Sequence, residues 1–129
     1  MRAVKSKDTR PERTVRSLLH LLGFRFRLHR KDLAGKPDIV LPRYRTVIFV
    51  HGCFFHGHNC KRGSREPKTN VVYWREKLRR NVERDQIVFN ELSAQNWKVL
   101  TVWECELKDL EGLGLRLSNA ITLTPMDKP

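Results

Sequence analysis

The residues best suited to chemistry lie close together in one short segment. Between His51 and Cys60, three histidines and two cysteines occur within ten residues, and a third cysteine, Cys105, follows much later. Imidazole and thiolate groups are common zinc ligands, and a structural zinc site takes four of them in a closed tetrahedron. A complete set would consist of Cys53, His58, Cys60 and Cys105. We therefore expect a structural zinc ion in this segment.

This ligand set has alternatives. His51 or His56 could replace His58, because the spacing alone does not select one histidine. Cys53 and Cys60 could instead form a redox pair, with the third cysteine buried as a small apolar residue. Three cysteines cannot all pair within one chain, and thiols stay reduced inside cells, so a metal site is the preferred interpretation.

An acidic residue precedes an apolar run. Pro37 and Asp38 lead into such a run, and a second one ends at His51, thirteen residues after Asp38. A carboxylate at the start of a strand can bind a hard divalent cation, as in many nucleases. The pattern resembles the PD-(D/E)xK nuclease core, in which the next strand carries a second carboxylate and a lysine. Here that strand ends in Phe49-Val50-His51 and offers neither.

Three helices are predicted around these residues. Thr9 and Glu12 have the spacing of a capping box, which favours a helix over residues 10–22. Apolar periodicity predicts one long helix, or two consecutive ones, over 70–96, with its apolar residues mostly on one face. A weaker helix, interrupted by two glycines, is expected over 107–117.

Alternating and continuous apolar runs predict the strands of one sheet. These runs cover 24–29, 38–41, 46–50 and 97–103, and the second and third are close enough to form a hairpin. The order of elements predicts an α/β fold, with a mixed central sheet flanked by helices. We expect one domain over 1–129, with the segment between Val50 and Asn70 as a zinc-stapled insert.

Composition narrows the function classes. The 129 residues are 40% hydrophobic and 31% charged, which is typical of a soluble globular protein. No window approaches 18 apolar residues, and the N-terminus lacks the apolar stretch of a signal peptide, so a cytoplasmic protein without membrane contact is expected. The net charge of +12 favours nucleic acid as the partner. The alternative is a basic surface that serves only solubility.

Several motifs together resemble the very short patch repair (Vsr) endonucleases. They are Pro37-Asp38, VIFVHGCFFH over 47–56, His58 with Cys60, NVERD over 81–85 and WKVLTVWEC over 97–105. The resemblance extends from Met1 to about Leu107. It implies an endonuclease that nicks DNA on the 5′ side of the thymine in a T:G mismatch and so initiates repair of deaminated 5-methylcytosine. It also implies a PD-(D/E)xK-like core, a structural zinc ion and a catalytic magnesium ion.

The same resemblance implies roles for single residues. Asp38 corresponds to the carboxylate that binds magnesium, and Val50, a threonine in a known member, would add its backbone carbonyl. His56 corresponds to the histidine proposed to activate the attacking water, and His51 to one that assists at the scissile phosphate. Glu12 corresponds to an acidic residue that reaches the site from the first helix, while its capping position offers an equally good structural role.

The remaining implied roles concern zinc and the mismatch. The zinc ligands would be Cys53, His58, Cys60 and Cys105. Phe54, Phe55 and Trp74 correspond to an aromatic wedge that enters the base stack beside the mismatch, where unstacking costs less than at a paired step. Phe54 could instead pack in the core. Family members usually have a longer basic N-terminal arm than this sequence shows.

The expected partner is double-stranded DNA with a T:G mismatch, and other mismatch-repair proteins are further candidates. We expect a monomer associated with the nucleoid. Two alternatives remain: a non-catalytic, zinc-stapled DNA-binding module, in which Asp38 and His56 would have no required role, and a related nuclease of a restriction or mobile-element system with a different substrate.

Overall fold

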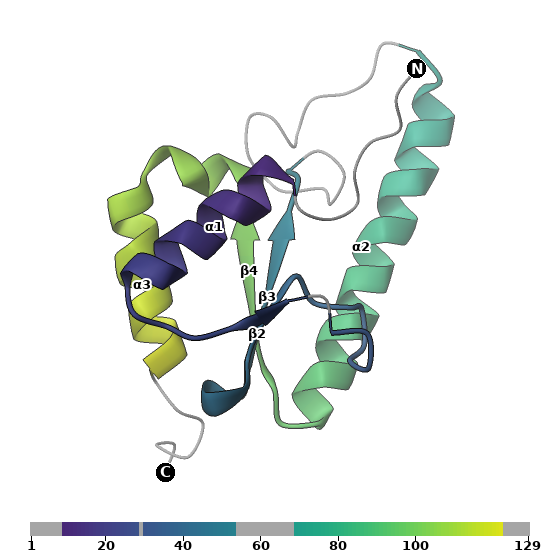
Figure 1. Cartoon of the computed structure of the whole chain (residues 1–129). Helices are drawn as coiled ribbons and strands as arrows, with labels where there is room; N and C mark the ends of the chain where they lie inside the picture. Colours follow the sequence, from purple (N-terminus) through teal and green to yellow (C-terminus); the bar gives the residue numbers. More distant parts are fainter. Residues whose placement is uncertain (1–8, 29, 54–68, 123–129) are drawn as a thin grey trace.

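Helices cover both faces of a mixed sheet (Figure 1). The computed structural model describes residues 9–28, 30–53 and 69–122. Within them the sheet has four strands in the order β1-β2-β3-β4. The elements are α1 (Arg10–Leu21), β1 (Arg27–Leu28), β2 (Ile39–Leu41), η1 (Pro42–Tyr44), β3 (Thr46–His51), α2 (Val71–Ala94), β4 (Lys98–Trp103), η2 (Glu104–Lys108) and α3 (Leu110–Thr122). The predicted mixed α/β architecture is confirmed.

The first helix begins where the capping pattern predicts. Thr9 is the N-cap: its hydroxyl accepts from the Glu12 N–H at 3.4 Å, and its own N–H donates to Glu12 Oε2 at 3.3 Å. This reciprocal pair satisfies backbone donors that the first turn leaves open. Val15 and Leu19, on one face of the helix, are fully buried. The capping box therefore fixes where α1 starts, and its apolar face fixes how α1 packs.

The central strands bring distant parts of the chain to one edge. β2 and β3 form the predicted antiparallel hairpin, and Arg45 adopts a left-handed conformation between them. β3 and β4 are parallel, with a register that runs from Thr46 opposite Lys98 to His51 opposite Trp103. The end of β3 therefore lies beside the end of β4.

The edge strand is shorter than predicted. Of the run over 24–29, only Arg27 and Leu28 pair with β2, and His29 lies outside the described residues. The alternation itself is present, because Phe24, Phe26 and Leu28 pack on the core while Arg25 and Arg27 are exposed.

Two apolar layers hold the helices on the sheet. α1 and α3 pack on one face, through Ile39 and Ile48 of the hairpin and Val102 of β4. α2 packs on the other face, where Val40 and Val47 contact Leu92. Alternate residues of β2 and β3 thus serve opposite layers, as the two-residue period of a strand requires.

The long helix contributes less to the core than the sequence predicts. α2 is continuous over 24 residues, of which Leu92 is the one that is buried. Val82 and Phe89, expected on the packed face, are 45% exposed. A helix of this length spans about 36 Å, whereas a six-residue strand spans about 20 Å, so α2 must extend beyond the sheet. Figure 1 shows its N-terminal half doing so.

The last helix starts later and runs further than predicted. α3 covers Leu110–Thr122 and is not interrupted at Gly112 or Gly114. Each glycine costs the helix about 1 kcal/mol. The burial of Leu117 and Ile121 favours the helix by more than this cost. Among the helices of the described ranges, none is both long and apolar enough to cross a membrane.

Substitution of Ile48 by alanine tests the core assignment. Ile48 is fully buried, so Ile48→Ala should lower the free energy of unfolding by about 2–5 kcal/mol in chemical denaturation. The matched control is Ile87→Ala on α2, where the side chain is 56% exposed, and it should change stability by less than about 0.5 kcal/mol. Equal losses for the two variants would contradict the assignment.

Candidate active site at the end of the sheet

Two carboxylates from different elements meet near the end of β3. Asp38 stands directly before β2, and Glu12 lies in the first turn of α1. The Val50 N–H donates to Asp38 Oδ2 at 2.7 Å, which ties the carboxylate to the neighbouring strand. Glu12 is 3% exposed, although acidic side chains are rarely buried unless paired. The structure therefore brings together two of the predicted site residues.

The two oxygens of Glu12 have different surroundings. Oε2 accepts from the backbone N–H and the hydroxyl of Thr9, at 3.3 and 3.0 Å. Oε1 is buried and accepts no hydrogen bond from the described residues, with the Arg16 Nη2 atom 3.8 Å away. Capping thus uses one oxygen, so the capping and active-site roles of Glu12 are compatible.

The pKa of Asp38 is shifted by its burial and by the neighbouring Glu12. The pKa of Asp38 is raised from 3.8 to about 6, first by burial and then by the charge of Glu12, while the Val50 N–H lowers it. The positive charge of Arg16 lowers the same pKa. Carboxylates that share a desolvated site resist double ionisation, so a bound cation would relieve the strain between them.

His51 lies at the same end of the sheet, as predicted. It is the last residue of β3, and its ring lies 5.2 Å from the Trp103 ring and 5.8 Å from the Phe49 ring. His51, Val50 and Asp38 line one hollow of about 620 Å³. A polar substrate group in this hollow would therefore meet a carboxylate and an imidazole together.

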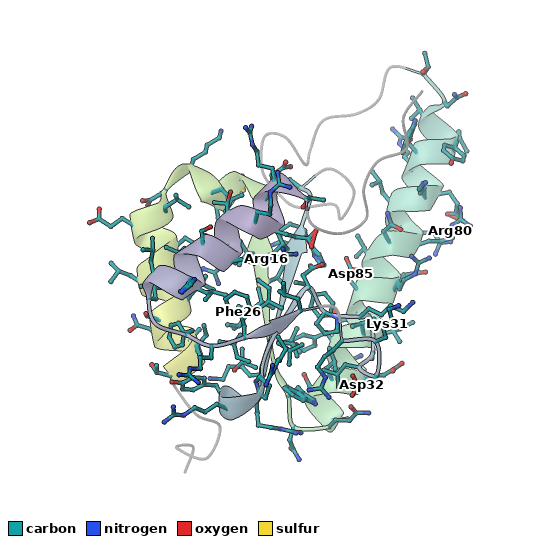
Figure 2. The ribbon with its side chains drawn as sticks, in the orientation of Figure 1. Arg16, Phe26, Lys31, Asp32, Arg80 and Asp85 are labelled. Atoms are coloured by element: carbon teal, nitrogen blue, oxygen red, sulfur yellow. The ribbon has the colours of Figure 1, made fainter. Side chains whose placement is uncertain are left out.

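The rim of this hollow is basic. Arg30, Lys31 and Lys36 reach it from the loop before β2, and Arg84 reaches it from α2, beside Asp85. Figure 2 shows Arg16 on α1 and Asp85 on α2, on the two sides of the sheet. Cationic side chains around a carboxylate site suit a substrate with a phosphate backbone.

A second hollow has a different character. It encloses about 1040 Å³ around the start of β1 and η1, and its lining includes Arg25, Arg43 and Tyr44 but no carboxylate. It offers no oxygen ligands from side chains of Asp or Glu, so of these two hollows only the one around Asp38 has a carboxylate that suits the metal site expected from the sequence.

The sequence predicts no individual role for Arg16 or for the cations of the rim, only a general positive charge that favours nucleic acid. Arg16 follows Glu12 by four residues, a spacing that places both on one face of a helix, and this signal was available from the sequence. Arg84 and Asp85 belong to the NVERD motif, but only the packing of α2 shows that they face the site.

The structure also joins two of the four predicted zinc ligands. The Cys105 N–H donates to the Cys53 sulfur at 3.4 Å, and Cys53 is fully buried. Neither cysteine forms a disulfide. His58 and Cys60, the other two, lie outside the described residues. The described ranges alone contain no cluster of three metal-ligating side chains.

Other predicted residues are placed only in part. His56, Phe54 and Phe55 also lie outside the described residues. Trp74 lies on the projecting half of α2, half-buried, with its ring 5.3 Å from the Tyr73 ring. It belongs to neither core layer of the described structure.

Comparison with known proteins identifies the family of the chain. The family model described as DNA mismatch endonuclease Vsr matches residues 1–62. The type II nicking enzyme V.XorIIP of Xanthomonas oryzae pv. oryzae is 55% identical over 121 residues, which are 94% of this chain and 88% of the relative. The type II nicking enzyme V.NmeAIP of Neisseria meningitidis is 50% identical over 84% of this chain and 77% of the relative.

A third relative carries the family name. The DNA mismatch endonuclease Vsr of Escherichia coli is 44% identical over 113 residues, which are 88% of this chain and 72% of the relative. The three relatives are named as nicking enzymes or as a DNA mismatch endonuclease, and the family model matches a range that includes Glu12, Asp38 and His51. The chain is a DNA endonuclease and belongs to the Vsr family of DNA mismatch endonucleases.

Proposed function

We propose that the protein is a magnesium-dependent endonuclease that nicks one DNA strand on the 5′ side of the thymine in a T:G mismatch. This reaction would initiate repair of deaminated 5-methylcytosine, with the protein acting as a monomer on duplex DNA beside other mismatch-repair proteins. The observation that carries the proposal is the pair formed by the buried Glu12 and the half-buried Asp38, with His51 beside Asp38 in the same hollow. The mismatch itself is suggested by the name of the relative from E. coli.

The carboxylate pair fits magnesium. Its oxygens are hard ligands, and the buried Glu12 Oε1 accepts no hydrogen bond from the residues that the structure describes. In antiparallel pairing, the N–H and C=O of one residue point to the same neighbouring strand. Since the Val50 N–H donates to Asp38, the Val50 carbonyl faces the same side and is the proposed third ligand.

The side chains then have separable tasks. Asp38, Glu12 and the Val50 carbonyl would hold the ion, which when bound would polarise the scissile phosphate and stabilise charge on the leaving oxygen. His51, in the same hollow, would donate a proton or a hydrogen bond at the phosphate. His56 is proposed to accept the proton of the attacking water. The hairpin that begins at Asp38 supports a PD-(D/E)xK-like core.

A structural zinc ion would attach the segment after β3 to the end of β4. Its proposed ligands are Cys53, His58, Cys60 and Cys105. The contact between Cys53 and Cys105 supports this set, because residues 52 positions apart supply neighbouring sulfur ligands. Four protein ligands leave no open position, so this ion would stabilise the fold rather than take part in catalysis.

A second candidate function keeps the chemistry and changes the target. V.XorIIP and V.NmeAIP are named type II nicking enzymes, and their identities of 55% and 50% exceed the 44% to the E. coli endonuclease. This favours a nicking enzyme that accompanies a restriction system and acts at mismatches within that system's recognition sequence.

One experiment tests the function and separates the two candidates. The purified protein, with magnesium, is incubated with T:G and T:A duplexes that differ only at the mismatch, each in a panel of flanking sequences. Nicking of T:G duplexes alone supports the proposal, and the preferred flanks identify the system. Equal nicking of both duplexes would refute mismatch specificity, and binding without nicking would indicate a DNA-binding module.

Asp38→Asn tests the metal-binding carboxylate. An amide is a poor magnesium ligand but can still accept the Val50 N–H, so nicking should disappear while duplex binding stays within about threefold. Because burial raises the Asp38 pKa to about 6, ionisation above that pH destabilises the folded state. The variant should therefore be more stable than the wild type at pH 8 without metal, by about 1–3 kcal/mol, and the difference should shrink toward pH 4.

The control for this prediction is Asp109→Asn, which changes the same group on an exposed residue. It should alter neither nicking nor the pH dependence of unfolding. A zinc-loaded Asp38→Asn protein that nicks at the wild-type rate would remove Asp38 from the mechanism.

Cys105→Ser tests the zinc site. Loss of one thiolate from a closed four-ligand site should reduce zinc from about one ion per chain to nearly none and lower the melting temperature. Metal content is measured on folded protein by mass spectrometry. His20→Ala, an exposed histidine on α1, is the control and should keep its zinc. A folded wild-type protein without zinc would contradict the site.

Trp74→Ala tests the aromatic wedge. Stacking on one ring is worth roughly 1–3 kcal/mol, so the preference for T:G over T:A in single-turnover nicking should fall by about 5- to 150-fold. Zinc content and melting temperature should change little, because Trp74 lies outside both core layers. Val72→Ala, at a side chain 81% exposed on the same turn, is the control. A large loss of stability with unchanged preference would place the ring in the core.

A further inference from the structure

Arg16 lies beside the carboxylate pair, one helical turn after Glu12 (Figure 2). Its Nη2 atom is 3.8 Å from Glu12 Oε1, and the side chains of Arg16 and Glu12 are 16% and 5% exposed. Its charge also acts on Asp38. The guanidinium therefore lies near both carboxylates, and the Arg16 side chain is still partly exposed.

The geometry of this ion pair differs from that of the exposed pairs. Arg116 contacts Glu106 at 2.9 Å and Arg79 contacts Glu76 at 2.6 Å, both within the range of charge-assisted hydrogen bonds. The more buried pair of Arg16 and Glu12 is the longer one, at 3.8 Å. A guanidinium presents five N–H donors in a planar fork, so it can face a carboxylate and still contact a phosphate.

One magnesium ion alone does not balance the negative charges of the proposed site. Two carboxylates and the scissile phosphate together carry three negative charges, whereas one magnesium ion supplies two positive ones. Further negative charge develops on the phosphoryl oxygens in the transition state, where preorganised cations stabilise it. The end of β3, Phe49-Val50-His51, contains neither lysine nor arginine.

We infer that Arg16 is a further catalytic residue, which contacts a non-bridging oxygen of the scissile phosphate from α1 and supplies the positive charge that the end of β3 lacks. This inference rests on the proposed function. The competing role is structural, with Arg16 only offsetting the charge of Glu12 and Asp38.

The rate measurement uses Arg16→Gln in the full-length protein with saturating magnesium. Single-turnover nicking of the T:G duplex should fall about 100-fold, as for other side chains that stabilise transition-state charge. Arg116→Gln, which removes an arginine from an ion pair on α3, is the control and should stay within about threefold of the wild type. If the wild type does not nick the duplex, the proposed function fails; if it nicks and Arg16→Gln matches the control, only this inference fails.

A binding measurement separates a phosphate contact from a structural role. The probes are two T:G duplexes, one natural and one with a methylphosphonate at the scissile position, which removes the charge of that phosphate. Affinities are measured with calcium, so that no cleavage is required. The wild type should lose about tenfold in affinity for the methylphosphonate and Arg16→Gln less than about twofold, giving a coupling of about fivefold in the double-mutant cycle. Equal losses in both proteins would overturn the inference.

Arg16→Lys is the second variant, because removal of the positive charge beside Glu12 and Asp38 could prevent folding. It keeps the charge beside Glu12 and loses the planar fork. The coupling to the phosphate should remain above about threefold in this variant. A folded Arg16→Lys protein without coupling would also overturn the contact, since a structural charge pair does not respond to the methylphosphonate.

Discussion

Keeping Glu12 and Asp38 together at the end of the sheet is the constraint on which the rest of the site depends. Burial raises the pKa of Asp38 to about 6, and the neighbouring Glu12 adds to this effect. Two groups counter it: the Val50 N–H and the charge of Arg16. Each comes from backbone or helix geometry that forms with the fold, so the site is assembled only when β3 and α1 are in place.

The apolar layers determine where this pair can form. Val15 and Leu19 pack α1 against the sheet. This packing sets the position of Glu12, which lies in the first turn of the same helix. The pairing of β2 with β3 brings Asp38 to Val50. A substitution that leaves a large cavity in this layer would therefore disturb the proposed metal ligands as well as stability, because the same contacts support both.

Much of this arrangement could be predicted from the sequence. The capping box at Thr9, the hairpin after Asp38 and the strand that ends at Trp103 depend on local patterns, and the structure confirms them. The resemblance to the Vsr family added roles for Glu12 and His51 that spacing alone could not give. The family membership is confirmed by the comparisons, whereas the roles remain predictions.

The errors have a common physical origin. Periodicity on α2 predicted a packed face, but the sheet is too short to cover a helix of 24 residues. Two glycines suggested an interrupted α3, yet Leu113, Leu117 and Ile121 bury enough surface to keep it continuous. Arg16 looked like one more surface cation in a chain of net charge +12 until the packing of α1 placed it at the carboxylates. In each case tertiary packing, rather than local preference, decided the outcome.

The fold also separates the proposed catalytic residues from Trp74 of the proposed aromatic wedge. The carboxylates, His51 and Arg16 belong to elements fixed by the two apolar layers, whereas Trp74 lies on the half of α2 that extends beyond the sheet. A change on the projecting half costs little core burial, because Leu92, the buried residue of α2, lies near its other end. If the proposed roles hold, substrate preference can change without disturbing the proposed hydrolytic site. Such a separation would be compatible with a family that includes both a DNA mismatch endonuclease and type II nicking enzymes.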